Sequence, residues 1–499
     1  MRLPPLASLG LCENPTYTIE VNDNVIQVDP SDILSLCWTD GLDTPCSVCL
    51  QHFDIAVAPP VRTLQLKRGS QSYCPTTRLL PTVVVTNTHL ICMKVHNIHF
   101  TPISHAWHDP VARAYASRET NLEAARMVFE LPVRVLLAAA QRYGRDIQIW
   151  HDYISIPQWQ DSFRGTTILP QIFQIFKYGG KALIHLDDEP TFDMFVLSNL
   201  GDIVLHSENL KRVFNARWFR RMWIIVEFLM CRDGYLMNSR YEIMSITFTS
   251  LIEKISQHRA LPLIPSRLPD STLDLMTSIP LFSRDTSTYN CLGHVYDLLA
   301  NQGCRSHRDR FIATSAILEQ DDHSSSLAKL PWDTQEACLY AAKRALQRND
   351  YSPLLLRPAK EPQYGEIRWL RGHTAMEADM WELGVQMSAA HSAPTIMPDD
   401  SVQLELQSIG LIDQTTTIVA KETTTAIPCP TCRTVMSCQL SMWQAPKDHA
   451  VLYCIPGLLY AGSGSASVGI IVDDSEVIGR ASFAKSVCDC AELVTVRII

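Results

Sequence analysis

Residues 217–230 read Arg-Trp-Phe-Arg-Arg-Met-Trp-Ile-Ile-Val-Glu-Phe-Leu-Met, an apolar run that contains a single carboxylate, Glu227. The apolar side chains that recur at steps of four, three and four are Trp218, Met222, Ile225 and Leu229. This spacing predicts a helix that is mostly buried. A carboxylate in such a helix needs a partner, a raised pKa or a position facing a cleft. Two interpretations stay open: an ion pair with an arginine, such as Arg221 or Arg308, and a functional carboxylate.

The composition is typical of a folded protein. The chain of 499 residues is 46% hydrophobic and 19% charged, which suggests two or three domains. Its formal net charge of -9, without a block of Lys or Arg, argues against a nucleic-acid partner, because affinity for phosphate backbones depends on clustered cations. No apolar run reaches the roughly 18 residues that span a bilayer, and the N-terminus does not resemble a signal peptide. We therefore expect a cytoplasmic protein without a membrane span.

Residues 97–235 alternate short apolar runs with amphipathic segments. The expected strands end near Ser104, Asp152 and Asp187, with helices between them. This alternation predicts an α/β domain with a parallel sheet covered by helices on both faces. In such sheets ligands bind beyond the carboxyl ends of the strands, where these three residues lie.

Three further regions complete the expected organisation. Residues 1–96 are predicted to form strands and loops, and residues 236–360 are predicted to be mainly helical. Residues 361–499 are predicted to be β-rich, from runs such as 415–420 and 466–472.

The 16 cysteines raise the question of metal binding. Cys46-Ser47-Val48-Cys49, with Cys37 and His52 nearby, has the ingredients of a zinc knuckle. The only second pair of the same form, Cys429-Pro430-Thr431-Cys432, is far away in the sequence, whereas closely spaced pairs are what make the motif specific. The interpretation we favour is therefore ordinary buried thiols and no metal site, with structural zinc as the alternative. His105, His108 and Asp109 also lack a clear further ligand segment for a metal.

Three segments carry a resemblance to a known family. They are Ile103-Ser104-His105-Ala106-Trp107, the run Ile149-Trp150-His151-Asp152-Tyr153-Ile154-Ser155-Ile156-Pro157-Gln158, and Arg221-Met222-Trp223-Ile224-Ile225-Val226-Glu227. In order and spacing they resemble the successive motifs of the fungal heterokaryon-incompatibility (HET) domain. The motifs "SHxW" and "DYxSIPQ" resemble those of a relative of that family.

The resemblance implies a fold and a function. HET domains are similar to TIR domains, so a TIR-like or flavodoxin-like parallel sheet is expected. The implied role is self/non-self recognition and programmed cell-death signalling in fungi. There the chain would be a signalling and assembly module that works through protein partners and self-association, without a cofactor.

An enzymatic alternative follows from the same resemblance, because some TIR domains hydrolyse NAD. It implies that Glu227 is the catalytic carboxylate, with NAD as the substrate. The ligand-binding residues would be Ser104, His105, Trp107, Asp152 and Trp223. The chemistry is reasonable, since breaking the nicotinamide–ribose bond gives the sugar oxocarbenium character, which a fixed carboxylate stabilises.

Overall fold

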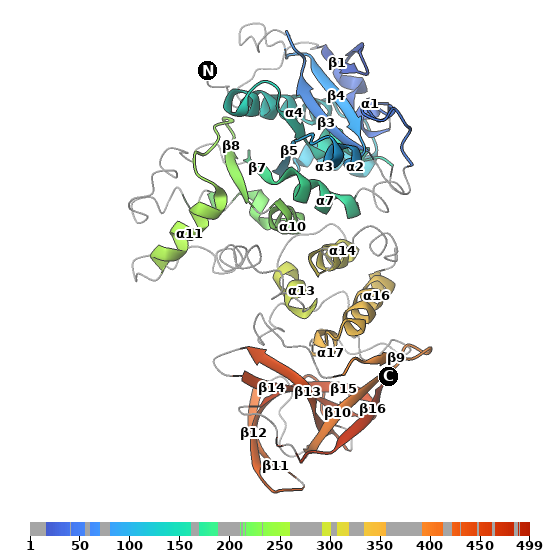
Figure 1. Ribbon diagram of the computed structural model, residues 1–499, viewed down its shortest axis with the longest axis vertical. Helices are drawn as coiled ribbons and strands as arrows, with labels where there is room; N and C mark the ends of the chain where they lie inside the picture. The colour runs from blue at the N-terminus through green and yellow to red at the C-terminus, as the bar shows by residue number, and fades with distance from the viewer. Residues whose placement is uncertain are drawn as a thin grey trace. The chain divides into compact units, whose positions relative to one another are not determined.

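The computed structural model divides into two compact units, Met1–Arg284 and Asp285–Ile499. The structure describes residues 16–39, 41–54, 60–69, 80–160, 169–187, 210, 213–214, 216–231, 233–259, 292–300, 307–318, 334–355, 392–412, 422–429, 431–446, 449–461, 465–483, 488 and 490–499. Each unit contains its own sheet (Figure 1).

The first unit is built on one eight-stranded sheet in the order β2-β1-β4-β3-β6-β5-β7-β8. The strands are β1 (Tyr17–Val21), β2 (Asn24–Val28), β3 (Val61–Leu66), β4 (Val83–Thr88), β5 (Thr101–His105), β6 (Gln148–Trp150), β7 (Lys181–Leu186) and β8 (Asp233–Asn238). Strands β1 to β4, from the N-terminal region, therefore lie in the same sheet as the strands of residues 97–235.

The sheet is mixed, so the expectation of a purely parallel sheet is corrected. Strands β6, β5, β7 and β8 are mutually parallel, whereas β1 pairs with β2, and β3 with both β4 and β6, in antiparallel fashion. The reason is local at the N-terminus. Asn22 and Asp23 form a two-residue turn with positive φ angles of 48° and 62°, and such a turn returns the chain antiparallel to itself.

The parallel half agrees with the sequence analysis. Strand β5 lies between β6 and β7, with Pro102 opposite Trp150 and Ser104 opposite Ile184. Because the three strands run in the same direction, the residues that follow them gather at one edge of the sheet. The prediction that Ser104, Asp152 and Asp187 lie at neighbouring strand ends is confirmed.

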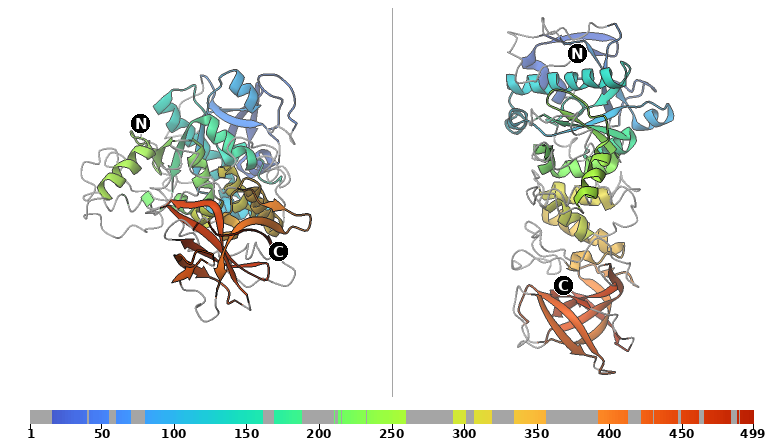
Figure 2. Two further views of the ribbon diagram at one scale, coloured as in Figure 1. Left: turned by 60° about the horizontal axis from the view of Figure 1, so that its bottom comes forward. Right: turned by 90° about the vertical axis from the view of Figure 1, so that its left-hand side faces the viewer.

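Helices cover both faces of this sheet (Figures 1 and 2). Those with described bounds are α1 (Ile33–Trp38), α2 (Leu90–Val95), α3 (Asp109–Ser117), α4 (Leu122–Tyr143), α5 (Asp152–Ser155), α7 (Leu169–Gly179), α10 (Met222–Cys231) and α11 (Phe248–Arg259). Helix α4 is the long central one; it begins where Asn121 Oδ1 accepts the N–H groups of Glu123 and Ala124. It packs with α1, α3 and α5, whereas α7 and α10 pack together against β5 and β7.

Residues 217–230 do not form the single helix that the apolar spacing predicts. A 3₁₀ turn, η4 (Arg217–Arg220), is followed by Arg221 in an extended conformation, with φ -102° and ψ 132°, and α10 starts only at Met222. The break lets the Arg221 guanidinium donate to the carbonyl oxygen of His105 at 2.6 Å. A tertiary hydrogen bond has thus replaced helical continuity.

The second unit contains helices, followed by an antiparallel sheet within residues 361–499, which are β-rich as predicted. The helices are α13 (Leu292–Ala300), α14 (His307–Leu318), α16 (Thr334–Gln347) and α17 (Ser352–Leu355). The strands are β9 (Thr395–Ile396), β10 (Val402–Leu411), β11 (Glu422–Pro428), β12 (Val435–Met442), β13 (Val451–Ala461), β14 (Ser465–Asp473), β15 (Glu476–Phe483) and β16 (Leu493–Ile498). The sheet is strongly curved (Figure 2). The predicted strand at 466–472 lies in β14, whereas 415–420 lies outside the described residues.

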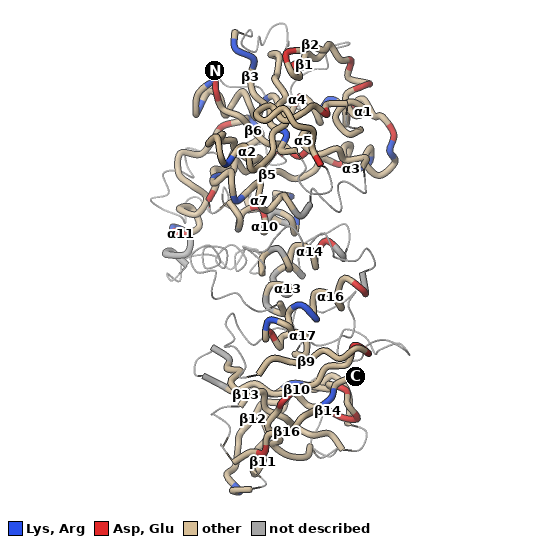
Figure 3. Tube along the Cα trace, turned by 45° about the vertical axis from the view of Figure 1, so that its right-hand side comes forward, with Lys and Arg blue, Asp and Glu red and all other residues tan. Residues whose placement is uncertain are grey.

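Two features relate to possible partners. Lys and Arg are scattered along the described parts of the trace rather than gathered in one block (Figure 3). Among the described helices, none is both long enough and apolar enough to cross a membrane.

Candidate functional site

At the end of β5, neighbouring side chains point to opposite faces of the sheet, as they do in any strand. Ser104, only 2% exposed, lies on the side of α10. Its Oγ donates to Glu227 Oε2 at 2.5 Å and accepts the indole N–H of Trp218 at 2.8 Å. Trp218, Ser104 and Glu227 thus form a chain of hydrogen bonds that fixes one carboxylate oxygen; we call it the Glu227 network.

Glu227 is partly exposed, and it is the single charged residue of the otherwise apolar helix α10. Burial raises the pKa of its carboxyl to about 7, against the lowering effects of the Arg221 charge and the Ser104 hydrogen bond. Asp152, the other carboxylate nearby, adds to the rise in this pKa. Near neutral pH, therefore, Glu227 is poised between its acid and its carboxylate form.

A second network occupies the other side of β5, and we call it the Asp152 network. His105 Nε2 lies 2.6 Å from Asp152 Oδ1, and the indole N–H of Trp107 donates to Asp152 Oδ2 at 2.6 Å. Burial acts to raise the pKa of Asp152, but the charge and hydrogen bond of His105 outweigh it and hold the pKa well below its usual value. Asp152 is therefore a fixed anion with both oxygens engaged, unlike Glu227.

Further groups extend the Asp152 network along the strand ends. The hydroxyl of Tyr153 accepts the backbone N–H of His108 at 3.0 Å, and His108 Nε2 contacts the carboxylate of Asp187. His151 is fully buried beside His105, and burial lowers the pKa of its imidazole to about 3, so it is neutral at physiological pH. The strand-end residues thus share one continuous polar layer inside the fold.

Arg221 connects the two networks. Its guanidinium donates to the His105 carbonyl, and its charge lowers the pKa of Glu227. The structure gives no ion pair between Arg221 and Glu227 among the residues it describes. The side chain of Arg308, the other partner that an ion-pair interpretation would use, lies outside the described side chains.

The residues singled out from the sequence are only partly brought together. Ser104 contacts Glu227 directly, whereas His105, Trp107 and Asp152 form the separate network behind β5. Trp223 points elsewhere: its ring packs at 6.1 Å from the ring of Phe173 in α7. The expected ligand-binding set is therefore split between two faces of the sheet.

His105, His151 and Asp152 also have the composition of a metal site, with ligand atoms within 4.8 Å of one another. Ligands on one metal ion stand about 3 Å apart or more, since each lies about 2 Å from the ion. The 2.6 Å contact between His105 and Asp152 is shorter, which is the distance of a direct hydrogen bond. We therefore describe these residues as a hydrogen-bonded network.

Sequence reasoning missed Trp218 as a member of the site, and it considered Arg221 only as an ion-pair partner of Glu227. Trp218 counted as part of an apolar stripe, yet its indole N–H is the donor that orients Ser104. The two residues are 114 positions apart, so no local spacing reveals the pair. The signal that was present is an indole and a guanidinium immediately before the helix that carries Glu227.

Neither models of known protein families, nor characterised proteins, nor solved structures match this chain in sequence or in fold.

Proposed function

We propose that this chain is a HET-like protein of fungal self/non-self recognition and cell-death signalling, and that its α/β unit acts by cleaving the nicotinamide–ribose bond of NAD. The observation that supports the chemistry is the state of Glu227. It is a partly exposed carboxylate with a pKa near 7, held by one hydrogen bond from Ser104. A structural carboxylate in an apolar helix would instead be expected in a tight ion pair, with its pKa lowered.

The proposed reaction needs little besides this carboxylate. As nicotinamide leaves as a neutral base, positive charge develops on the ribose, and the Glu227 carboxylate stabilises that charge while accepting a hydrogen bond from a ribose hydroxyl. Trp218 and Ser104 keep one oxygen in place and leave the other for the sugar. The electron pair of the broken C–N bond leaves with nicotinamide, and water then adds to C1′ of the ribose and releases one proton to solvent.

The competing role is an assembly module without chemistry. It is supported by the Asp152 network, in which both oxygens of the Asp152 carboxylate are hydrogen-bonded, one to His105 and one to Trp107. Such a network stabilises a fixed surface for partners whether or not Glu227 reacts.

Purified full-length protein incubated with NAD distinguishes the two roles by the release of nicotinamide. Since only the ionised carboxylate is active in this proposal, the rate should fall about tenfold per pH unit below pH 7 and level off above it. The pH profile of kcat/KM, measured between pH 5 and pH 8.5, checks this. Absence of nicotinamide release at every pH, with folded protein, favours the assembly module.

A further inference from the structure

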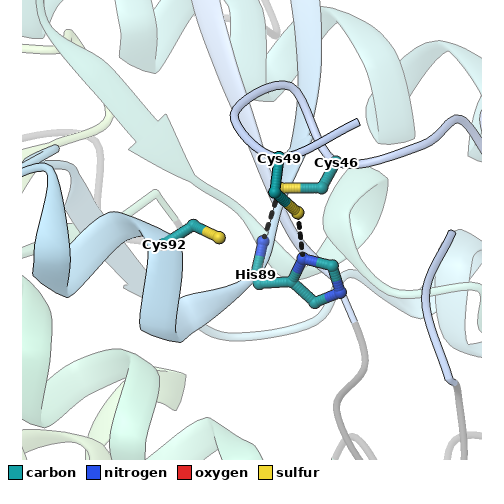
Figure 4. A group of neighbouring side chains, drawn as sticks. All are labelled: Cys46, Cys49, His89 and Cys92. Carbon is teal, nitrogen blue, oxygen red and sulfur yellow. Dashed lines mark hydrogen bonds between the residues drawn. The ribbon is translucent and has the colours of Figure 1, made fainter. Parts of the chain in front are cut away.

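The loop at residues 41–54 and the start of α2 bring four metal-binding side chains together. They are Cys46, Cys49, His89 and Cys92, and one ligand atom from each lies within 4.8 Å of all the others. Figure 4 shows the three sulfurs and the imidazole gathered between the loop and the helix. The sequence offered only the first pair, and Cys37 is instead buried in the hydrophobic core.

The four ligands come as two pairs, and the spacing within each pair suits the binding of one metal ion. Cys46 and Cys49 are three residues apart in a turn, and His89 and Cys92 are three residues apart at the first turn of α2. In a tetrahedral zinc site with Zn–S of about 2.3 Å and Zn–N of about 2.0 Å, ligand atoms stand about 3.5–3.8 Å apart. Cys49 Sγ lies 3.4 Å from His89 Nδ1, which is close to that separation.

The backbone of the loop is arranged like a metal knuckle. Leu50 has a positive φ of 59° and its N–H donates to the carbonyl of Cys46 at 2.9 Å, which closes the turn. The N–H of His89 points at Cys46 Sγ, at 3.4 Å, and the N–H groups of Val48 and Cys49 also donate to this sulfur. Convergent N–H donors stabilise a thiolate, the form in which cysteine binds zinc.

The loop is held to the sheet by hydrogen bonds, such as those of Asn87 to Leu42 and Thr44, but it has little apolar core of its own. Most of its side chains between residues 41 and 54 are exposed or partly exposed, and only Leu42 and Cys46 are buried. Short segments without an apolar core are commonly stabilised by a metal or by disulfides. In this structure the three cysteines of the group form no disulfide, and a disulfide between two of them would leave the third cysteine and His89 unused.

The second unit independently contains an all-cysteine group. The sulfurs of Cys429, Cys432, Cys488 and Cys490 lie within 4.8 Å of one another, with Cys490 Sγ 3.4 Å from Cys429 Sγ and 3.2 Å from Cys488 Sγ. The turn between the first two has the same design: Arg433 has a φ of 58° and donates its N–H to the carbonyl of Cys429. The N–H of Thr431 points at the sulfur of Cys429 at 3.4 Å.

We propose that the chain binds two structural zinc ions, one through Cys46, Cys49, His89 and Cys92 and one through Cys429, Cys432, Cys488 and Cys490. Four soft ligands without an open position favour closed tetrahedral zinc over magnesium, calcium or a catalytic metal. The first ion joins the 41–54 loop to α2, and the second joins the β11–β12 turn to the segment before β16.

Metal analysis of full-length protein, purified without a polyhistidine tag or chelator, tests the proposal. We expect two zinc ions per chain in the wild type and the loss of one in each of the double variants Cys46→Ser/Cys49→Ser and Cys429→Ser/Cys432→Ser. Cys37→Ser and Cys438→Ser are matched controls, because both cysteines lie in the same units but outside the two groups, and both should retain two zinc ions. His89→Cys should also retain both, since it replaces one ligand by another.

A second measurement remains decisive if the double variants fail to fold. Wild-type protein loaded with cobalt(II) should show the intense thiolate-to-cobalt absorption and visible bands of tetrahedral sites, and His89→Cys should shift those bands without loss of metal. The proposal is overturned if the wild-type protein contains no zinc, if it contains iron in place of zinc, or if intact mass shows disulfides within either group. It is also overturned if the control variant Cys37→Ser loses as much zinc as the ligand variants do.

Discussion

Glu227→Gln is expected to lower nicotinamide release at least about 100-fold, because removing one preorganised group aimed at transition-state charge usually has this effect. The substitution keeps the shape of the side chain and the acceptor for the Ser104 hydroxyl, so the fold should persist. Steady-state kinetics at pH 8, where the wild-type carboxyl is ionised, measures the loss. Glu123→Gln is the matched control: it removes the same charge from an exposed position in the first turn of α4 and should leave the rate unchanged.

The same substitution should make the protein more stable at alkaline pH. The pKa of Glu227 is raised to about 7 in the folded state, so the folded protein binds this proton more tightly than the unfolded chain does. The corresponding stability is present below the ordinary glutamate pKa of 4.5 and is lost as the pH rises through 7, by up to about 3 kcal/mol. The Tm of Glu227→Gln relative to wild type should therefore increase between pH 5 and pH 8.

A structural ion pair would give the opposite signs. If Glu227 served mainly to neutralise Arg221, the glutamine variant would melt below the wild type, most clearly at pH 8, and its activity would fall only in proportion to the folded fraction. Thermal melts of the wild type and Glu227→Gln over this pH range, compared with their kinetics, distinguish a catalytic Glu227 from a structural one.

Arg62→Ala is expected to destabilise the first unit by about 3–5 kcal/mol, because it breaks a buried, charged hydrogen-bond hub. Arg62 is 1% exposed and donates to Asn87 Oδ1 at 3.1 Å, to the carbonyl of Ile154 at 3.2 Å and to Asp43 Oδ1 at 3.2 Å. Its removal leaves the Asn87 and Ile154 acceptors unpaired in the interior. For a unit of this size the loss corresponds to roughly 10 °C in Tm.

Arg68→Ala is the control for this change. Arg68 also pairs with an aspartate, Asp146, at 3.3 Å, but both side chains are largely exposed, at 86% and 76%. Exposed pairs of this kind contribute at most about 1 kcal/mol, so its Tm should change little. Equal destabilisation by the two variants, in denaturant or thermal unfolding, would contradict a special role for Arg62.

Arg62 also shows how the first unit is held together around its polar layer. The backbone carbonyl of Asn87, the residue that Arg62 contacts, accepts the N–H of Ser47 in the 41–54 loop. Ile154, its other contact, belongs to α5, the helix that begins with Asp152. A single buried guanidinium thus links the loop that carries Cys46 to the helix that carries Asp152.

The sequence by itself determined the features that depend on local periodicity. The strands that end near Ser104, Asp152 and Asp187, the helices between them and the sheet edge that these three residues share all follow from the alternation of short apolar runs with amphipathic segments. The unusual position of Glu227 was also visible, because one charge within an apolar run is a local contrast.

Only the tertiary structure decided which distant groups meet. The interruption at Arg221 arises from a hydrogen bond to His105, 116 residues away, which no helical propensity encodes. The antiparallel pairing of β3 with β6, the donation of Trp218 to Ser104 and the meeting of Cys46 with Cys92 depend likewise on chain segments brought together by folding. The hydrophobic effect that drives this packing is non-directional, so the pattern of apolar residues specifies burial but not the partner of each polar group.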